Sequence, residues 1–176
     1  MDQGLHQLQG KTELFVTGTL PLLEEFYRDK LLMMLRHQAG ARLVGQYDVN
    51  NTYQYIVNRE DVQLSWVGKA IEELGGTLES QTEPARPANG KAAAAAQRVI
   101  EEDARDAQSF VERWRPRVDA MTHARHRGML RVILGETSEQ QRFFEQALAG
   151  RTDLLGRRGE QLGPSHGEVL PSRWIE

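Results

Sequence analysis

At 176 residues the chain is long enough for one domain with a buried core, and it contains no cysteine. Within this chain, the lack of cysteine excludes disulfides, thiolate metal sites, iron–sulfur clusters and thiol nucleophiles. A composition that is 39% hydrophobic and 27% charged is typical of a globular protein, and a net charge of −3 provides no general attraction to nucleic acid or anionic lipid.

The sequence also lacks signals for export or membrane insertion. The first twenty residues contain no basic segment followed by an apolar run, so we expect no signal peptide. The longest apolar stretch, Leu31 to Leu35, is far shorter than the roughly 20 residues that cross a bilayer. We therefore expect a cytoplasmic protein with no membrane span and no nucleic-acid partner.

The first helix is expected to begin near Thr19. Residues 1–18 contain scattered apolar positions and two glycines, which indicate an N-terminal arm lying against the body of the protein. Thr19 can cap a helix with its hydroxyl group, and Pro21 fits the first turn. From Leu20 onward, apolar residues recur at helical spacing until Gly40.

The second helix has the clearest pattern in the chain. Inward positions follow one another at steps of three and four residues, which is typical of a helix packed lengthwise on its neighbours. They are Leu43, Gln46, Asn50, Tyr53, Val57, Glu60, Leu64, Val67, Ile71 and Leu74. Gly75 and Gly76 are expected to end this helix, and the Pro- and Gly-containing residues 77–90 to form a loop or crossover.

Two further helices follow the loop. Lys91 and the five alanines after it are a strong helix start, and the stripe of this third helix is Ile100, Asp103, Ala107, Phe110 and Trp114. Pro116 is expected to break or kink it. A fourth helix is predicted from Thr122 to Ala149, with Met129, Ile133, Glu136, Gln140, Phe143 and Ala147 facing inward.

These elements predict an all-α fold, an antiparallel four-helix bundle over residues 19–150. Residues 1–18 are the N-terminal arm, and residues 151–176 are an extended C-terminal tail that ends with Trp174, Ile175 and Glu176. We find no strand alternation of useful length and no internal repeat in the sequence. Trp66, Trp114 and Trp174 are interpreted as packing anchors, and His123 and His126 as surface residues.

Each predicted helix carries an acidic residue within or beside its apolar stripe. Glu60 lies between Val57 and Leu64, and Asp103 lies between Ile100 and Ala107 with Glu102 beside it. Glu136 lies between Ile133 and Gln140. In the first helix Glu24 lies near the stripe, and a small rotation would place Glu25 there instead. Ionised carboxylates are seldom buried without a cation or hydrogen-bond donors, so these positions call for partners.

Two kinds of partner fit such acids. Divalent metals take carboxylate oxygens, and the core of a bundle can hold two ions between facing helices. Alternatively, the polar stripe residues form a hydrogen-bonded layer satisfied within the protein. The layer would contain Gln46, Asn50, Glu60, Asp103, Glu136 and Gln140, with Arg98, Arg105, Arg131 or Tyr53 as their partners.

The segment Glu60-Asp61-Val62-Gln63, followed by Ile71 to Gly76, resembles the second helix of ferritin-like and rubrerythrin-like proteins. In that family a Glu-x-x-His motif precedes a helix end of Leu-Gly-Gly. Glu60 matches the glutamate, and Gln63 stands at the position of the histidine. Glu136 with Glu139 resembles the motif of the fourth helix, again without histidine.

The resemblance implies a ferritin-like fold over residues 20–150 and a set of metal ligands. Glu24 matches the single acid of helix one, and Asp103 or Glu102 that of helix three. The implied ligands are Glu24, Glu60, Gln63, Asp103, Glu136 and Glu139, and the implied metals are iron or manganese.

Two functions follow. In the first, which we favour, the protein is a ferritin-like bundle with a degenerate metal centre that serves as a structural or binding subunit and is not an enzyme. In the alternative, it is a carboxylate-bridged di-iron or di-manganese protein for metal oxidation or sequestration, hence a di-metal oxidase if it is an enzyme. We expect it to form a homo-oligomer, or to bind a protein partner through residues 151–176.

Overall fold

The computed structural model describes residues 3–87 and 90–156, and the side chains of residues 18–87 and 90–156. It contains four helices: α1 (Gln3–Ala41), α2 (Tyr47–Glu73), α3 (Ala92–Asp119) and α4 (Ala124–Leu148). No strand occurs in the described ranges. The predicted all-α four-helix bundle is therefore confirmed. Among the described residues, none of the helices has a stretch that is long and apolar enough to cross a bilayer.

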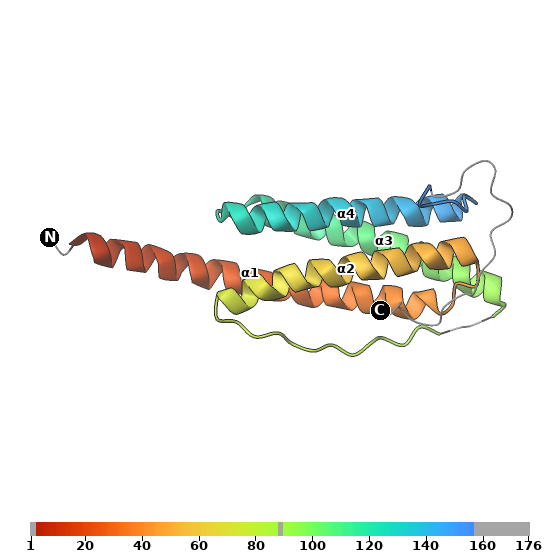
Figure 1. The fold of residues 1–176 in the computed structure, drawn as a ribbon, viewed down its shortest axis with the longest axis horizontal. Helices are drawn as coiled ribbons and strands as arrows, with labels where there is room; N and C mark the ends of the chain where they lie inside the picture. Colours follow the sequence, from red (N-terminus) through yellow and green to blue (C-terminus); the bar gives the residue numbers. More distant parts are fainter. Residues whose placement is uncertain (1–2, 88–89, 157–176) are drawn as a thin grey trace.

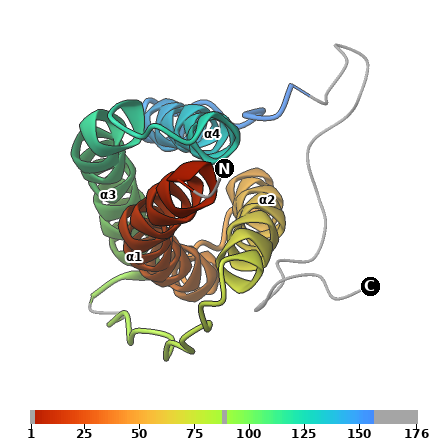
Figure 2. The ribbon, with the colours of Figure 1, turned by 90° about the vertical axis from the view of Figure 1, so that its left-hand side faces the viewer.

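The four helices surround one core (Figures 1 and 2). Each helix packs on two neighbours: α1 contacts α2 and α3, and α4 contacts α3 and α2. Neighbouring helices run antiparallel, whereas the diagonal pairs run parallel. The connection from α2 to α3 runs back along the length of the bundle (Figure 1), because both helices begin at the same end.

The start of α1 differs from the prediction. The helix already begins at Gln3, so Thr19 and Pro21 lie inside it, and its first turns extend beyond the end of the bundle (Figure 1). The predicted arm lying against the body is therefore wrong for residues 3–17. A cap residue and a proline show where a helix can begin, but proline removes only one hydrogen bond, and the exposed Pro21 ring is tolerated here.

The other helix ends agree with the sequence pattern to within a few residues. After α2, Gly75 takes a φ of +81°, a conformation that favours glycine, and the Gly76 N–H bonds the Ile71 carbonyl at 2.9 Å. Of the predicted break or kink at Pro116, the break does not occur, because α3 continues for about one more turn to Asp119. The predicted tail begins as an ordered segment, in which Leu154 is buried, while residues 157–176 lie outside the described part.

The two hairpins, α1–α2 and α3–α4, are related by a repeat of 77 positions that inspection of the sequence missed. All seven buried residues of α4 lie 77 positions after a buried residue of α2. Within the helices, the identical residues at this spacing are Glu24/Glu101, Glu25/Glu102, Arg28/Arg105, Asp29/Asp106, Arg36/Arg113, Ile56/Ile133, Gln63/Gln140 and Ala70/Ala147. The repeat is difficult to see in the sequence because most core positions keep their burial but change their residue type.

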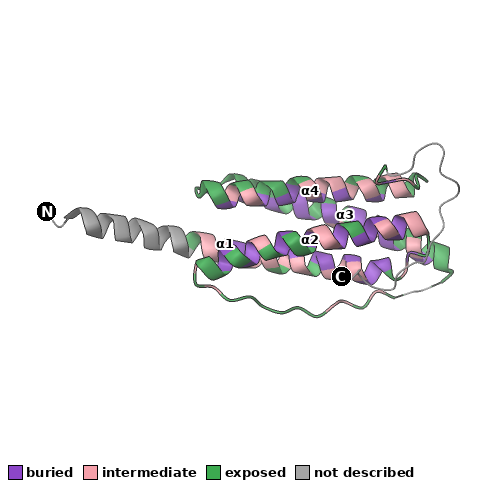
Figure 3. Cartoon of the chain, viewed as in Figure 1, coloured by how far each residue is buried: buried purple, intermediate pink, exposed green. Residues whose placement is uncertain are grey.

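The core of the described residues contains three apolar clusters and a set of buried polar side chains. The largest includes Leu23, Phe26, Trp114 and Ile133, the second includes Tyr53, Ile100, Phe144 and Leu154, and the smallest consists of Met34, Val57 and Leu64. Figure 3 shows buried positions on the inward faces of all four helices. The buried polar residues are Lys30, His37, Asn50, Thr52, Gln54, Glu60, Gln63, Asp103, His126, Thr137 and Gln140. Those near the middle of the bundle form the candidate site.

Candidate functional site

The centre of the bundle is a buried lysine. Lys30 Nζ lies 2.8 Å from Glu60 Oε1, and neither side chain is exposed to solvent. It also donates to Thr137 Oγ1 at 3.1 Å and to Gln140 Oε1 at 3.5 Å. An ammonium group has three N–H donors, so α2 and α4 together provide an acceptor for each of them.

Helical spacing explains how these groups meet. Leu23, Phe26, Lys30, Met33 and His37 follow one another at steps of four and three on the inward face of α1. The aliphatic part of Lys30 therefore lies within the apolar core, and only its charged end needs polar partners. Thr137 donates its own proton to the Ile133 carbonyl at 2.9 Å, which leaves its oxygen free to accept from Lys30.

His37 lies one turn beyond the lysine and binds the other oxygen of the same carboxylate. Its Nδ1 is 2.9 Å from Glu60 Oε2, and its ring packs against Tyr53 and Phe144. Burial raises the pKa of the Glu60 carboxyl, but His37 and Lys30 outweigh it and hold that pKa below its ordinary value. An ionised carboxylate only accepts, so His37 Nδ1 donates to it. His37 Nε2 is buried and has no hydrogen-bond partner.

The protonation of His37 follows from the same contacts. Burial alone would lower the pKa of the imidazole, but the charge of Glu60 and its hydrogen bond outweigh that effect, with a further contribution from Asp103. The pKa of His37 therefore lies above its ordinary value. The arrangement therefore favours a cationic His37 beside the Glu60 carboxylate.

A second buried acid fastens the long α2–α3 connection. Asp103 accepts from Tyr53 Oη at 2.5 Å and from Arg86 Nη1 at 2.7 Å. Arg86 lies in the connection, and it also donates to Glu102 and to the backbone carbonyls of Arg36 and Val99. Burial raises the pKa of Asp103, and the neighbouring cations and donors offset this only partly. Burial, followed by the charge of Asp103, raises the pKa of Tyr53 well above its ordinary range.

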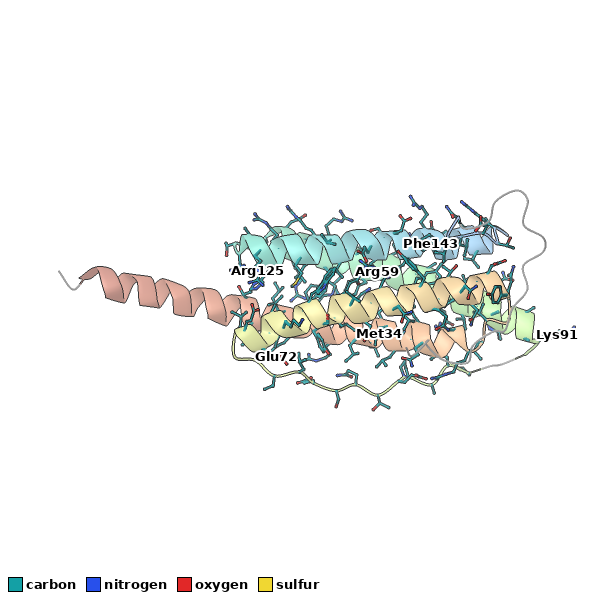
Figure 4. The ribbon with its side chains drawn as sticks, in the orientation of Figure 1. Met34, Arg59, Glu72, Lys91, Arg125 and Phe143 are labelled. Atoms are coloured by element: carbon teal, nitrogen blue, oxygen red, sulfur yellow. The ribbon has the colours of Figure 1, made fainter. Side chains whose placement is uncertain are left out.

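Glu136 takes part in a third, outer contact between α2 and α4. It is half-buried, and it accepts from Arg59 and, at 2.5 Å, from Gln63 Nε2. The Arg59 guanidinium also lies 6.0 Å from the Trp66 ring centroid. Figure 4 labels Arg59 on α2 and Phe143 on α4, along the seam between the two helices.

The six residues predicted as metal ligands do not share one site. Glu60, Gln63 and Asp103 are buried as predicted, and a hydrogen bond joins Gln63 to Glu136. Glu24 lies half-buried at the edge of a surface pocket formed by α1, α2 and the connection, and Glu25 is paired with Arg117 instead. Glu139 lies at the surface, where Arg142 binds it. Glu102 lies beside Asp103 but binds Arg86.

Three details of the predicted layer are wrong. The inward residue at the centre of α4 is Thr137 and not Glu136. Ile133 and Gln140 are buried as predicted, but Leu130 and Phe144 are buried in place of Met129 and Phe143. Gln46 is exposed. The prediction that Tyr53 serves as a partner is confirmed, but Arg98, Arg105 and Arg131 are exposed and the basic partners are Lys30, Arg86 and Arg59.

Lys30, His37 and Thr137 were missed, although a signal was present. They occupy positions of the apolar spacing in α1 and α4, where a polar residue was not considered. The prediction for His126 is also wrong, since this side chain is buried beneath His123, with ring centroids 4.0 Å apart. His123 is exposed as expected, and its Nδ1 accepts from the His126 N–H as the N-cap of α4.

The donor set at the centre does not fit a two-metal site. Its single carboxylate, Glu60, is already bound to an ammonium and an imidazole, and the remaining groups are a hydroxyl, an amide and a thioether. Within the described residues, no group of three or more His, Asp or Glu side chains is arranged to hold a metal ion. The side chains of Lys30, His37 and Glu60 can therefore keep paired charges away from solvent in the middle of the bundle.

No protein-family model, curated protein sequence or solved structure matches the chain.

Proposed function

We propose that this protein is a non-enzymatic structural subunit, a ferritin-like bundle in which the Lys30–Glu60 ion pair takes the place of a metal centre. The observation that carries the proposal is the fully buried Lys30 ammonium, 2.8 Å from the carboxylate of Glu60. A positive charge supplied by the chain itself would balance this acid without any metal.

The connectivity supports a ferritin-like arrangement. Two antiparallel hairpins are joined by one long connection, and ferritin-like bundles have one such crossover. Ferritin-like di-metal proteins hold their ions with one glutamate from each of two helices and a Glu-x-x-His motif from each of the other two. The 77-residue repeat offers equivalent positions for such a set.

The repeat also changes the expected register of the site. Glu60 and Gln63 of α2 correspond to Thr137 and Gln140 of α4, and Lys30 of α1 corresponds to Ala107 of α3. We propose that these six positions, rather than Glu24, Asp103, Glu136 and Glu139, are the counterparts of the family's ligands. Of the six, Glu60 is the only carboxylate. A centre with this composition supports a structural role and not the oxidation of metal or substrate.

The test is the metal content of the full chain, purified from cells supplied with iron, manganese and zinc. We expect each metal to stay far below one ion per chain, and added metal to leave the midpoint of thermal unfolding unchanged. One or more ions per chain, lost in Glu60→Gln, would overturn the proposal in favour of the di-iron or di-manganese alternative.

A rebuilt variant tests the register. It combines Lys30→Glu, Ala107→Glu, Gln63→His, Thr137→Glu and Gln140→His, which restores the family's donor set at the six positions. We expect it to need a divalent metal for folding and to bind that metal, because its acids would otherwise repel one another. A rebuilt chain that folds equally well without metal and takes none up would contradict the ferritin-like register.

A further inference from the structure

Three of the six exposed large apolar residues in the described part of the chain lie along the seam between α2 and α4. Tyr55, Val62 and Val132 are 39%, 40% and 51% exposed, and all three lie on the outward side of these two helices. Half-buried aromatic rings, Trp66 on α2 and Phe143 on α4, continue the patch. Figure 4 shows the seam from outside, with Arg59 and Phe143 labelled along it. Exposed apolar side chains gathered along one seam favour a binding surface.

The contacts across the seam have a definite order. Tyr55 meets Phe143 edge to face, with ring centroids 6.3 Å apart. About one turn along, Arg59 is paired with Glu136. About two turns further along α2 lies Trp66, at a level that the antiparallel α4 reaches near Val132. An ion pair is therefore flanked on both sides by apolar residues, and both aromatic residues and arginine are enriched at protein interfaces.

The pairs across the seam make this face self-complementary, because Tyr55 lies at the height of Phe143 and Arg59 at the height of Glu136. In the 77-residue repeat Tyr55 is equivalent to Val132, Trp66 to Phe143 and Arg59 to Glu136. Apolar positions are thus equivalent to apolar positions, and the basic position is equivalent to the acidic one. If a second copy is placed on the face by a two-fold axis parallel to the helices, α2 of each copy lies over α4 of the other. Arg59 of each chain then faces a glutamate, and Tyr55 faces a phenylalanine.

We propose that the α2–α4 face is the contact surface of a two-fold symmetric homodimer, in which Arg59 of each chain pairs with Glu136 of the other. The apolar residues provide the driving force, whereas the charges select the partner and fix its orientation. The hollow of about 470 Å³ beside Tyr55 and Phe143 leaves room for the aromatic side chains of the second copy. This inference extends the proposed structural role but does not depend on metal content.

The opposite face provides a matched control. Between α1 and α3 a groove of about 370 Å³ has ion pairs at both ends, Asp29–Arg113 and Arg36–Asp106. Arg36 is as exposed as Arg59, with 32% against 36% of the side chain accessible. However, this face exposes one large apolar residue, Leu32, where the α2–α4 face exposes three. We therefore expect substitutions on it to leave association unchanged.

The experiment is sedimentation equilibrium of the full chain over a range of concentrations. We expect the wild type to reach twice its chain mass of 20.0 kDa. Arg59→Glu and Glu136→Arg should each weaken the dimer more than about tenfold, because like charges then face each other twice across the axis. Val132→Glu should do the same, and the controls Leu32→Glu and Arg36→Glu should not.

Mixing the Arg59→Glu chain with the Glu136→Arg chain is the most direct test of the proposed dimer. A chain with Arg59→Glu carries two acids at these positions and a chain with Glu136→Arg carries two bases, so the mixture should form a heterodimer although neither chain pairs with itself. A mixture that stays monomeric would overturn the proposal, as would a wild-type dimer dissolved by Leu32→Glu and not by Val132→Glu. A monomeric wild type would overturn it as well. If Trp174→Ala then produced a dimer, the occupant of the face would be the chain's own C-terminal segment.

Discussion

Lys30 and Glu60 form an ion pair in the middle of the bundle, with 2.8 Å between Nζ and Oε1 and no solvent-exposed surface on either side chain. Taking two charges out of water is costly, and their attraction offsets that cost only when both partners are present. Lys30→Met and Glu60→Gln should therefore each lower the free energy of unfolding by about 3–5 kcal/mol, and the double variant by clearly less than the sum.

Urea denaturation of the four chains, followed by far-ultraviolet circular dichroism, measures this cycle. The matched control is Arg28–Glu79, an exposed pair 3.1 Å apart, whose disruption should change stability by less than about 1 kcal/mol. Strict additivity of the two core substitutions would show that the pair is not coupled.

His37 predicts a pH dependence with a definite sign. Since its folded-state pKa lies above the ordinary value of 6.5, the stability it contributes is complete below pH 6.5 and is lost as the pH rises through the raised pKa. The difference in unfolding free energy between wild type and His37→Gln should therefore shrink as the pH increases above 6.5. A difference that stays constant or grows from pH 6.5 to 9 would contradict the assigned shift.

His126 serves as the control of opposite sign. Burial, with the nearby charges of His123 and Arg125, lowers the pKa of His126 below 6.5. Its contribution is therefore present above pH 6.5 and is lost as the pH falls through the lowered pKa. When the free energy of unfolding is measured against pH for wild type and His126→Gln, the difference between the two should shrink as the pH falls below 6.5.

Arg86 should hold the α2–α3 connection onto the bundle. Its guanidinium is nearly buried and bonds Asp103, and Arg86→Met would leave that acid with Tyr53 as its donor. We expect a loss of about 3–5 kcal/mol and much faster proteolysis within residues 77–91. Arg42, which is exposed and bound to Glu83 in the same connection, is the control, and Arg42→Met should cost less than about 1 kcal/mol. Equal protease resistance in the two variants would contradict this role.

Two helical glycines should respond oppositely to alanine. A Cβ at Gly40 would lie 2.7 Å from Arg86 Nη1 and 2.9 Å from Val99 Cγ1, so Gly40→Ala should destabilise the protein by about 1–3 kcal/mol. At the exposed Gly135 a Cβ would meet no atom within 4 Å, and Gly135→Ala should stabilise α4 by about 0.5–1 kcal/mol. Thermal unfolding of both variants checks the pair, and a stabilising Gly40→Ala would show that the helix is not packed this closely on α3.

The sequence by itself determined the number of helices, most of their ends and much of what they bury. Apolar spacing, the alanine run and the terminal glycines are local signals, and a helix repeats its inward face every three to four residues whatever it packs against. The burial of Glu60 and Asp103 follows from the same periodicity. The need of these acids for partners could also be derived, since buried charge is costly in any fold.

Only the tertiary structure decided which partners those are. Lys30 and Glu60 lie 30 positions apart, and Arg86 reaches Asp103 from a connection without helical periodicity. In α4 the buried residue at the centre is Thr137, next to the predicted Glu136. The physical reason is that periodicity places a residue on one face of its own helix. It does not determine how far two packed helices are shifted along their axes or rotated relative to each other. Long basic side chains span more than one turn, so the relative shift and rotation of the helices decide which residue neutralises a buried acid. The four acids predicted from the stripes therefore became two buried centres, Glu60 and Asp103, with Glu136 in an outer ion pair and Glu24 at the edge of the bundle.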